Sequence, residues 1–336
     1  MKKRIEIVDL WRFIIAIIVM LHHTYLFHDY NGAKYPMYAP VYYVDILFLL
    51  TGYFTYLHFS NRHYDNVPKA CFEYTVRKFA VLLPYSTLAL LVQYIIDSSK
   101  HWGVSLRSVI ASFYEMPFDM LYLRESYTNV SRIVPLWFIS AMFLTFPVIL
   151  LIVQIKNKYT IAFITFLYPV FYYNYTGMSA IRDWPHDLLR AIAGMCLGIF
   201  VCALLSIIED YRTEQDDKCS VLLTLIEIAT LLYPIVASIF VWGGTNKLCL
   251  LSLVIGFTIM LSGRSYTSKL HIPGCNFLQK ISMPLYIWQW TVGSLILKFA
   301  YNLPLATKLV IYFAGTLIVS LATMGLVNLY KKIRTK

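Results

Sequence analysis

Ten apolar runs, each close to the length that crosses a bilayer, constrain this chain more than any other feature of its sequence. They span approximately residues 8–27, 40–60, 79–96, 136–153, 159–173, 190–208, 219–241, 247–262, 281–300 and 307–330. A helix of about 20 residues crosses the hydrocarbon core and satisfies its own backbone hydrogen bonds there. Of the 336 residues, 59% are hydrophobic and 14% are charged, which excludes an ordinary soluble domain. We therefore predict an all-α integral membrane protein with about ten transmembrane helices in one bundle.

The distribution of positive charge predicts the orientation of this bundle. Lys and Arg are more numerous in the segments that lie inside when the N-terminus is inside, so both termini are expected in the cytoplasm. The net charge of +11 then belongs to loops held against anionic lipid, and nothing in the pattern indicates nucleic-acid binding. The first run lacks a small-residue cleavage site, and we find no internal repeat. We interpret residues 1–336 as one integral-membrane domain.

The first apolar run carries three ionisable side chains, Asp9, Arg12 and His23, on one helix face. At 100° per residue, Arg12 and His23 fall within roughly 20° of each other and about 16 Å apart along the axis. His22 points roughly 80° away, so His23 is the favoured residue of the pair. Ionisable groups inside a span usually face a protein interior or a wet cavity. The six cysteines show no metal-ligand spacing, so no metal is expected at this site.

The second span carries an acid at a depth similar to that of His23. Asp45 lies roughly 7–8 Å below the outer end of its span, and His23 lies roughly 6 Å below the outer end of the first. A short antiparallel connection favours these two helices as neighbours. A carboxylate beside an imidazole fixes its tautomer and holds it as a general base. The alternative is that Asp45 is a structural residue whose carboxylate is hydrogen-bonded to other groups in the bundle.

Two segments outside the first spans also carry candidates. Arg77 and Lys78 precede the third span. Cations there can hold the phosphates of a nucleotide-like donor or simply anchor the chain at the cytoplasmic surface. Residues 97–135 contain an apolar pattern at helical spacing that is too charged to span a membrane. This segment is expected to be an interfacial amphipathic helix or an ordered loop.

Several motifs in order resemble the acyltransferase-3 family of polytopic membrane acyltransferases. VDLWRFIIAIIVMLHH (8–23) is similar to the family's opening, with Arg12 and His23 at its characteristic spacing. VDILFLLTGYF (44–54) resembles "VDLFFxxSGF", and PLWFISAMFL (135–144) resembles "WxLxxxxxF". Two further motifs depart from the family. VRKFAVLLP (76–84) has Val81 where a second Arg is common, and SMPLYIWQW (282–290) has Gln289 where His is common.

The resemblance implies transfer of an acyl group, most often acetyl from acetyl-CoA, to a hydroxyl of a cell-surface polysaccharide or lipid-linked glycan. It also implies a multi-pass protein of the plasma (inner) membrane whose central cavity serves a cytoplasmic donor and an acceptor on the far side. His23 is then the candidate general base, oriented by Asp45 or by Asp9. Arg12, Arg77 and Lys78 are the candidate acyl-CoA contacts. No permanently bound cofactor is expected, and polysaccharide-synthesis proteins are possible partners.

Alternatives to this enzyme remain at the level of sequence. Many helices with intramembrane charges also fit a glycan or lipid transporter or flippase, although we find no inverted halves. The motif departures also allow a sensor with a degenerate site. A structural pair of Arg12 with Asp9 is an alternative role, and it does not exclude a donor contact. A group of charged and polar residues lies at the outer entry of the sixth span: Asp183, His186, Asp187 and Arg190. These residues either hold an acceptor sugar or belong to an exposed loop.

Overall fold

The computed structural model describes residues 5–27, 41–60, 62, 64–99, 106–123, 132–176, 185–211, 220–240 and 246–334. Within these ranges the chain is helical and contains no strand, which confirms the all-α prediction. The helices are α1 (Glu6–His23), α2 (Val41–Ser60), α3 (Val67–Ser98), α4 (Leu106–Phe113), α5 (Met116–Met120), α6 (Leu136–Ile152), α7 (Lys158–Thr176), α8 (His186–Asp210), α9 (Val221–Phe240), α10 (Asn246–Ser262), α11 (Cys275–Phe299) and α12 (Leu305–Arg334). Short 3₁₀ turns follow α1 at Thr24–Phe27 and α10 at Thr267–Lys269.

Each of the ten predicted apolar runs overlaps one of these helices. By length and composition alone, four described segments are long and apolar enough to cross a membrane: Glu6–Phe27, Val67–Ser98, His186–Asp210 and Leu305–Ile333. Shorter apolar helices lie at Leu136–Ile152, Val221–Ala237 and Lys247–Ser262. The structure is therefore that of a helical membrane protein.

Helix α3 begins about three turns before its apolar run. The side chain of Asn66 caps it by accepting a hydrogen bond from the backbone N–H of Lys69 at 2.9 Å, and Pro68 occupies the first turn. Both residues are typical helix-start signals, because the first turn leaves backbone donors without helical partners. Because the cap lies at Asn66, the helix includes the charged stretch that contains Arg77 and Lys78. Those two cations consequently lie on a continuous helix.

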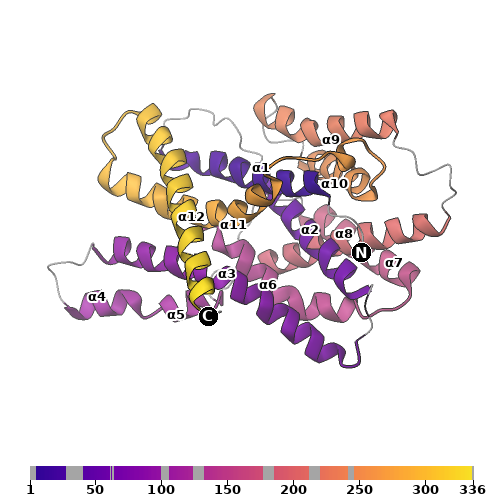
Figure 1. The fold of residues 1–336 in the computed structure, drawn as a ribbon, viewed down its shortest axis with the longest axis horizontal. Helices are drawn as coiled ribbons and strands as arrows, with labels where there is room; N and C mark the ends of the chain where they lie inside the picture. Colours follow the sequence, from indigo (N-terminus) through magenta and orange to yellow (C-terminus); the bar gives the residue numbers. More distant parts are fainter. Residues whose placement is uncertain are drawn as a thin grey trace.

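The helices pair in an order that differs from their order along the chain (Figure 1). Helix α1 packs chiefly against α11, whereas α2 packs chiefly against α8, which also contacts α6 and α7. Helices α9 and α10 form a pair at one edge of the bundle, and α4 and α5 lie beside α3 at another (Figure 1). The first two spans do contact each other, as expected, but each packs more extensively against a partner distant in sequence.

The contact between α2 and α8 depends on glycine. A Cβ atom added at Gly198 would overlap the backbone carbonyl oxygen of Leu49, and one added at Gly52 would overlap that of Met195. The two backbones therefore meet with no side chain between them, as small residues permit in membrane helices. Gly52 and Gly198 thus allow the close approach of α2 and α8.

The described part of the segment between α3 and α6, residues 106–123, is helical but broken. Helices α4 and α5 are separated by a turn at Tyr114 and Glu115, and apolar side chains such as Leu106 and Ile110 are exposed. The hydroxyl of Tyr94 in α3 donates a hydrogen bond to buried Asp119 of α5. The amphipathic pattern thus forms two short helices held against α3.

Replacing Gly198 by Ala should weaken the α2–α8 contact. Overpacking typically costs about 1–3 kcal/mol, and here the clash is with backbone that cannot rotate away. Thermal unfolding in detergent should therefore show a lower midpoint. Gly325→Ala in α12 is the matched control, because its new Cβ meets no atom within 4 Å. An unchanged midpoint for Gly198→Ala would contradict the backbone-to-backbone contact.

Candidate active site

A cavity of about 460 Å³ lies among five helices. Helices α1 and α11 form one side of it, and α2, α3 and α6 form the others. Its size falls within the range of small-molecule sites. The residues that line it are Arg12, Ala16, Leu47, Leu50, Thr51, Phe54, Arg77, Lys78, Val81, Leu82, Phe138, Met142, Phe146, Gln279, Ser282, Met283 and Tyr286. The predicted central cavity is thus present.

All three cations predicted to contact the donor line this cavity: Arg12, Arg77 and Lys78. The guanidinium of Arg12 donates a hydrogen bond to Asp9 at 3.2 Å and lies 4.9 Å from the ring centre of Phe54. Asp9 and Phe54 therefore hold Arg12 from α1 and α2, and the remaining guanidinium surface lines the cavity. Helix α1 (Arg12) and helix α3 (Arg77 and Lys78) thus both supply positive charge to this cavity.

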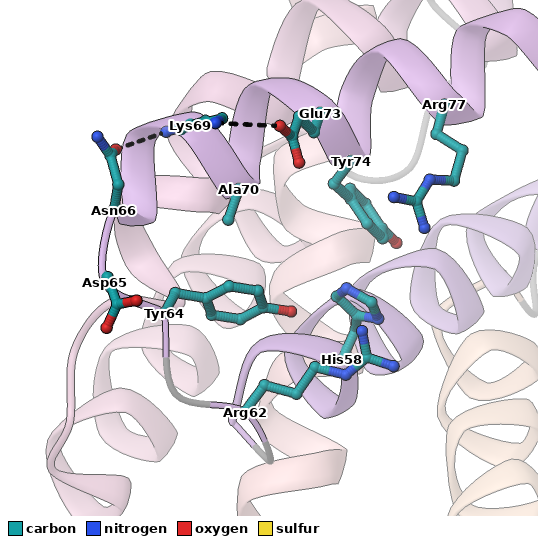
Figure 2. Close-up of a pocket in the computed structure, with 10 residues that line it drawn as sticks. All are labelled: His58, Arg62, Tyr64, Asp65, Asn66, Lys69, Ala70, Glu73, Tyr74 and Arg77. Carbon is teal, nitrogen blue, oxygen red and sulfur yellow. Dashed lines mark hydrogen bonds and ion pairs between the residues drawn. The ribbon is translucent and has the colours of Figure 1, made fainter.

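A second pocket, of about 340 Å³, opens where α2 ends and α3 begins. Figure 2 shows His58 and Arg62 facing Tyr74 and Arg77 across it. Lys69 also lines the pocket and pairs with Glu73 at 4.0 Å. The other lining residues are Tyr64, Asp65, Asn66 and Ala70. Because Arg77 lines both spaces, the polar pocket and the larger cavity adjoin at this side chain.

His23 lies at the other end of α1 and is only 4% exposed. Its Nδ1 is 3.2 Å from Oε1 of Gln289 in α11, which is fully buried. The ring also meets the edge of Trp290 at a centroid distance of 5.5 Å. On α11, Gln289 follows cavity-lining Tyr286 by three residues, which is about 4.5 Å of helix rise. On α1, His23 follows cavity-lining Ala16 by seven residues, about 10 Å of helix rise, and neither His23 nor Gln289 lines the cavity.

The expected pairing of His23 with Asp45 is corrected by this geometry. Asp45 accepts hydrogen bonds from Nε and Nη2 of Arg190, both at 2.8 Å, and from the hydroxyl of Tyr173 at 3.2 Å. Arg190 also lies 5.4 Å from the ring centre of Trp137. Helix α2 packs chiefly against α8, and its Asp45 carboxylate meets Arg190 of α8 and Tyr173 of α7 instead of His23.

Asp9 is likewise too far away to orient His23. The two residues are 14 positions apart on one continuous helix, which separates them by about 21 Å. The ion pair with Arg12 is the local i,i+3 alternative that the sequence allowed.

The group at the outer entry of the sixth span does not form one site. Arg190 is buried in the ion pair with Asp45, and Asp187 is also buried. His186 is partly buried, and its backbone carbonyl accepts a hydrogen bond from Tyr172. Asp183 lies outside the described residues. Sequence reasoning did not find the pairing of Arg190 with Asp45, because nothing in the linear pattern relates residues 145 positions apart.

The family model for the acyltransferase domain matches residues 5–325, which is nearly the whole chain. The chain belongs to the acyltransferase-3 family. No curated protein and no solved structure matches it. The helical membrane fold and the family together make this chain a membrane acyltransferase.

The motif positions of this acyltransferase converge on the cavity. Thr51, which stands where the family commonly has Ser, lines it and donates its hydroxyl to the carbonyl of Leu47 at 2.8 Å. Val81, in place of a common Arg, also lines the cavity and makes that wall apolar. Gln289, in place of a common His, is the hydrogen-bond partner of His23. One departure therefore lies on the cavity wall and the other against His23.

Breaking the Asp45–Arg190 pair should destabilise the acyltransferase strongly. Removing one partner of a buried ion pair typically costs about 3–5 kcal/mol, because the other charge stays buried alone. Asp45→Asn and Arg190→Met should each lower the unfolding midpoint in detergent, whereas the double variant Asp45→Leu/Arg190→Met should recover much of the loss. If the decreases in unfolding midpoint of the single variants simply added in the double variant, the two groups would act independently.

Proposed function

We propose that this protein is an O-acyltransferase that moves an acyl group, most often acetyl, from acyl-CoA to a hydroxyl of a cell-surface polysaccharide or lipid-linked glycan. The observation that carries the proposal is the pair of adjoining spaces that share Arg77. One is polar and rich in cations, and the other is a mostly apolar cavity lined by Tyr286, which lies three residues before the Gln289 that contacts buried His23. This arrangement suits an elongated ligand with a charged head and an apolar, reactive tail.

The polar pocket supports the donor assignment. Coenzyme A carries phosphates, and Arg and Lys side chains are the usual phosphate partners because they donate charge-assisted hydrogen bonds. Arg62, Lys69 and Arg77 offer such donors within one pocket. Arg12 and Lys78 add positive charge farther in. The phosphates of the donor would stay in the cation-lined region while its thioester arm extends toward His23.

The chemistry at His23 is general-base catalysis. A sugar hydroxyl is a poor nucleophile, so the imidazole removes its proton as the oxygen attacks the thioester carbonyl. The C–S bond then breaks, and the imidazolium returns the proton to the departing thiolate. An acyl-His intermediate is the alternative route, in which the imidazole attacks the thioester first.

The same proposal places the protein in the plasma membrane with both termini in the cytoplasm. The cation-lined end of the site then faces the cytoplasmic acyl-CoA, and the His23 end faces the acceptor. Membrane lipids surround the bundle, and polysaccharide-synthesis proteins are the expected partners. A glycan or lipid transporter is the competing function, and it predicts no consumption of acyl-CoA.

Acetyl-CoA turnover by the purified protein tests the proposal. His23→Ala should lower kcat by about 10²–10⁴-fold while donor binding persists, because only the base is lost. Arg12→Ala should instead raise KM for acetyl-CoA. Lys156→Ala, at an exposed position outside both spaces, is the control and should match the wild type. If the wild-type protein neither binds nor consumes any acyl-CoA, the enzyme proposal falls and transport becomes the leading function.

A truncated donor tests the division of the site. Arg62→Ala and Lys69→Ala should raise KM for acetyl-CoA but not for acetyl-pantetheine, which lacks the nucleotide and its phosphates. His23→Ala should lower kcat with both donors, because the reacting thioester is common to them. Equal effects of Arg62→Ala on the two donors would exclude phosphate binding in the polar pocket.

A further inference from the structure

The hydrogen bonds of Gln289 determine which way its amide faces. Its Nε2 donates to the backbone carbonyl of Tyr286 at 2.9 Å, and its Oε1 lies 3.2 Å from Nδ1 of His23. A carbonyl oxygen can only accept, so it must be met by the NH₂ group. Turning the amide over would set two oxygens against each other. The network therefore assigns Oε1 to His23.

This orientation also determines the tautomer of His23. An amide oxygen is an acceptor only, so the ring nitrogen that it contacts must carry the hydrogen. A neutral imidazole has one N–H, and with that hydrogen on Nδ1 the other nitrogen, Nε2, is the proton acceptor. Burial strengthens the preference, because an N–H or oxygen left unpaired at this depth is costly. His23 is 4% exposed and Gln289 is fully buried.

The amide is itself held by its surroundings. Tyr286, whose carbonyl anchors Gln289, donates its hydroxyl to the carbonyl of Pro135 at 3.0 Å and thereby ties α11 to the start of α6. Trp290 meets the His23 ring edge-on from the next position of α11. Both the rotation of the amide and the plane of the imidazole are thus constrained from the same helix.

We infer that Gln289 is a positioning residue that holds His23 in the Nδ1–H tautomer, so that Nε2 is the nitrogen that takes the proton from the acceptor hydroxyl. The tautomer follows from the hydrogen bonds alone, whereas its catalytic use rests on the proposed function. A neutral amide does this without adding a second buried charge, which a carboxylate in the same place would do.

The tautomer can be measured without any turnover. Solid-state NMR of ¹⁵N-histidine-labelled protein distinguishes protonated from unprotonated ring nitrogens, and the difference between wild type and His23→Asn isolates the His23 signals. We expect a protonated Nδ1 and an unprotonated Nε2 in the wild type at neutral pH. Gln289→Met should redistribute these signals, because the thioether does not fix the tautomer. A protonated Nε2 with an unprotonated Nδ1 in the wild type would overturn the inference.

Kinetics test the positioning role. Gln289→Met should lower kcat on the order of tenfold or more and leave KM for acetyl-CoA unchanged, since Gln289 does not line the donor cavity. Gln93→Met is the matched control, because Gln93 is a buried amide that bonds to Asp97 rather than to His23.

The outcomes separate the two levels of the argument. A Gln289→Met protein with wild-type kcat would overturn the positioning role. A wild-type protein that consumes no acyl-CoA would overturn the proposed function and with it the catalytic use of His23. The NMR result would then still decide whether Gln289 sets the tautomer.

Discussion

The buried ion pair between Asp45 and Arg190 is the constraint on which the arrangement of the bundle depends. Two charges in a low-dielectric interior are tolerated only with close pairing and further hydrogen bonds, and this pair has two bonds of 2.8 Å and a third donor in Tyr173. It holds α2 against α7 and α8, where Gly198 lets the backbones touch. Helix α1 packs chiefly against α11, and the cavity lies among these two helices and α2, α3 and α6.

Hydropathy was sufficient to predict the helices, because a span in lipid has few structural alternatives. Hydropathy was not sufficient to predict where the helices begin and end. Helix α3 starts at Val67, where Asn66 supplies a cap, well before the chain becomes apolar. Prolines such as Pro84 and Pro284 lie inside helices that continue through them, as neighbouring elements permit in membrane proteins. Helix packing order was not predictable, because loop length constrains which helices can meet but not which faces prefer each other.

The site divides in the same way. Arg12, Arg77 and Lys78 were predicted together because each lies near the same end of its span, and depth alone brings such residues to one level. The partner of His23 requires helix rotation as well as depth. Asp45 bonds to Arg190 rather than to His23, and the residue that does meet His23, Gln289, is 266 positions away in the sequence. The sequence held one signal for the partner of His23. Gln289 stands where the family motif commonly has His, and this departure marks the residue that contacts the candidate base.

Charge explains why the cations and the imidazole lie at different depths. Moving a phosphate into an apolar interior is expensive unless cations accompany it, so a charged donor is held most cheaply near the entrance. The walls toward α6 are apolar, with Phe138 and Met142, and suit only the uncharged part of such a donor. Beyond them a neutral Gln289 faces His23. Under the proposed function, the reacting thioester is the only part of the donor that must reach the imidazole. A base positioned by an amide then keeps that end of the path free of fixed charge before the proton moves.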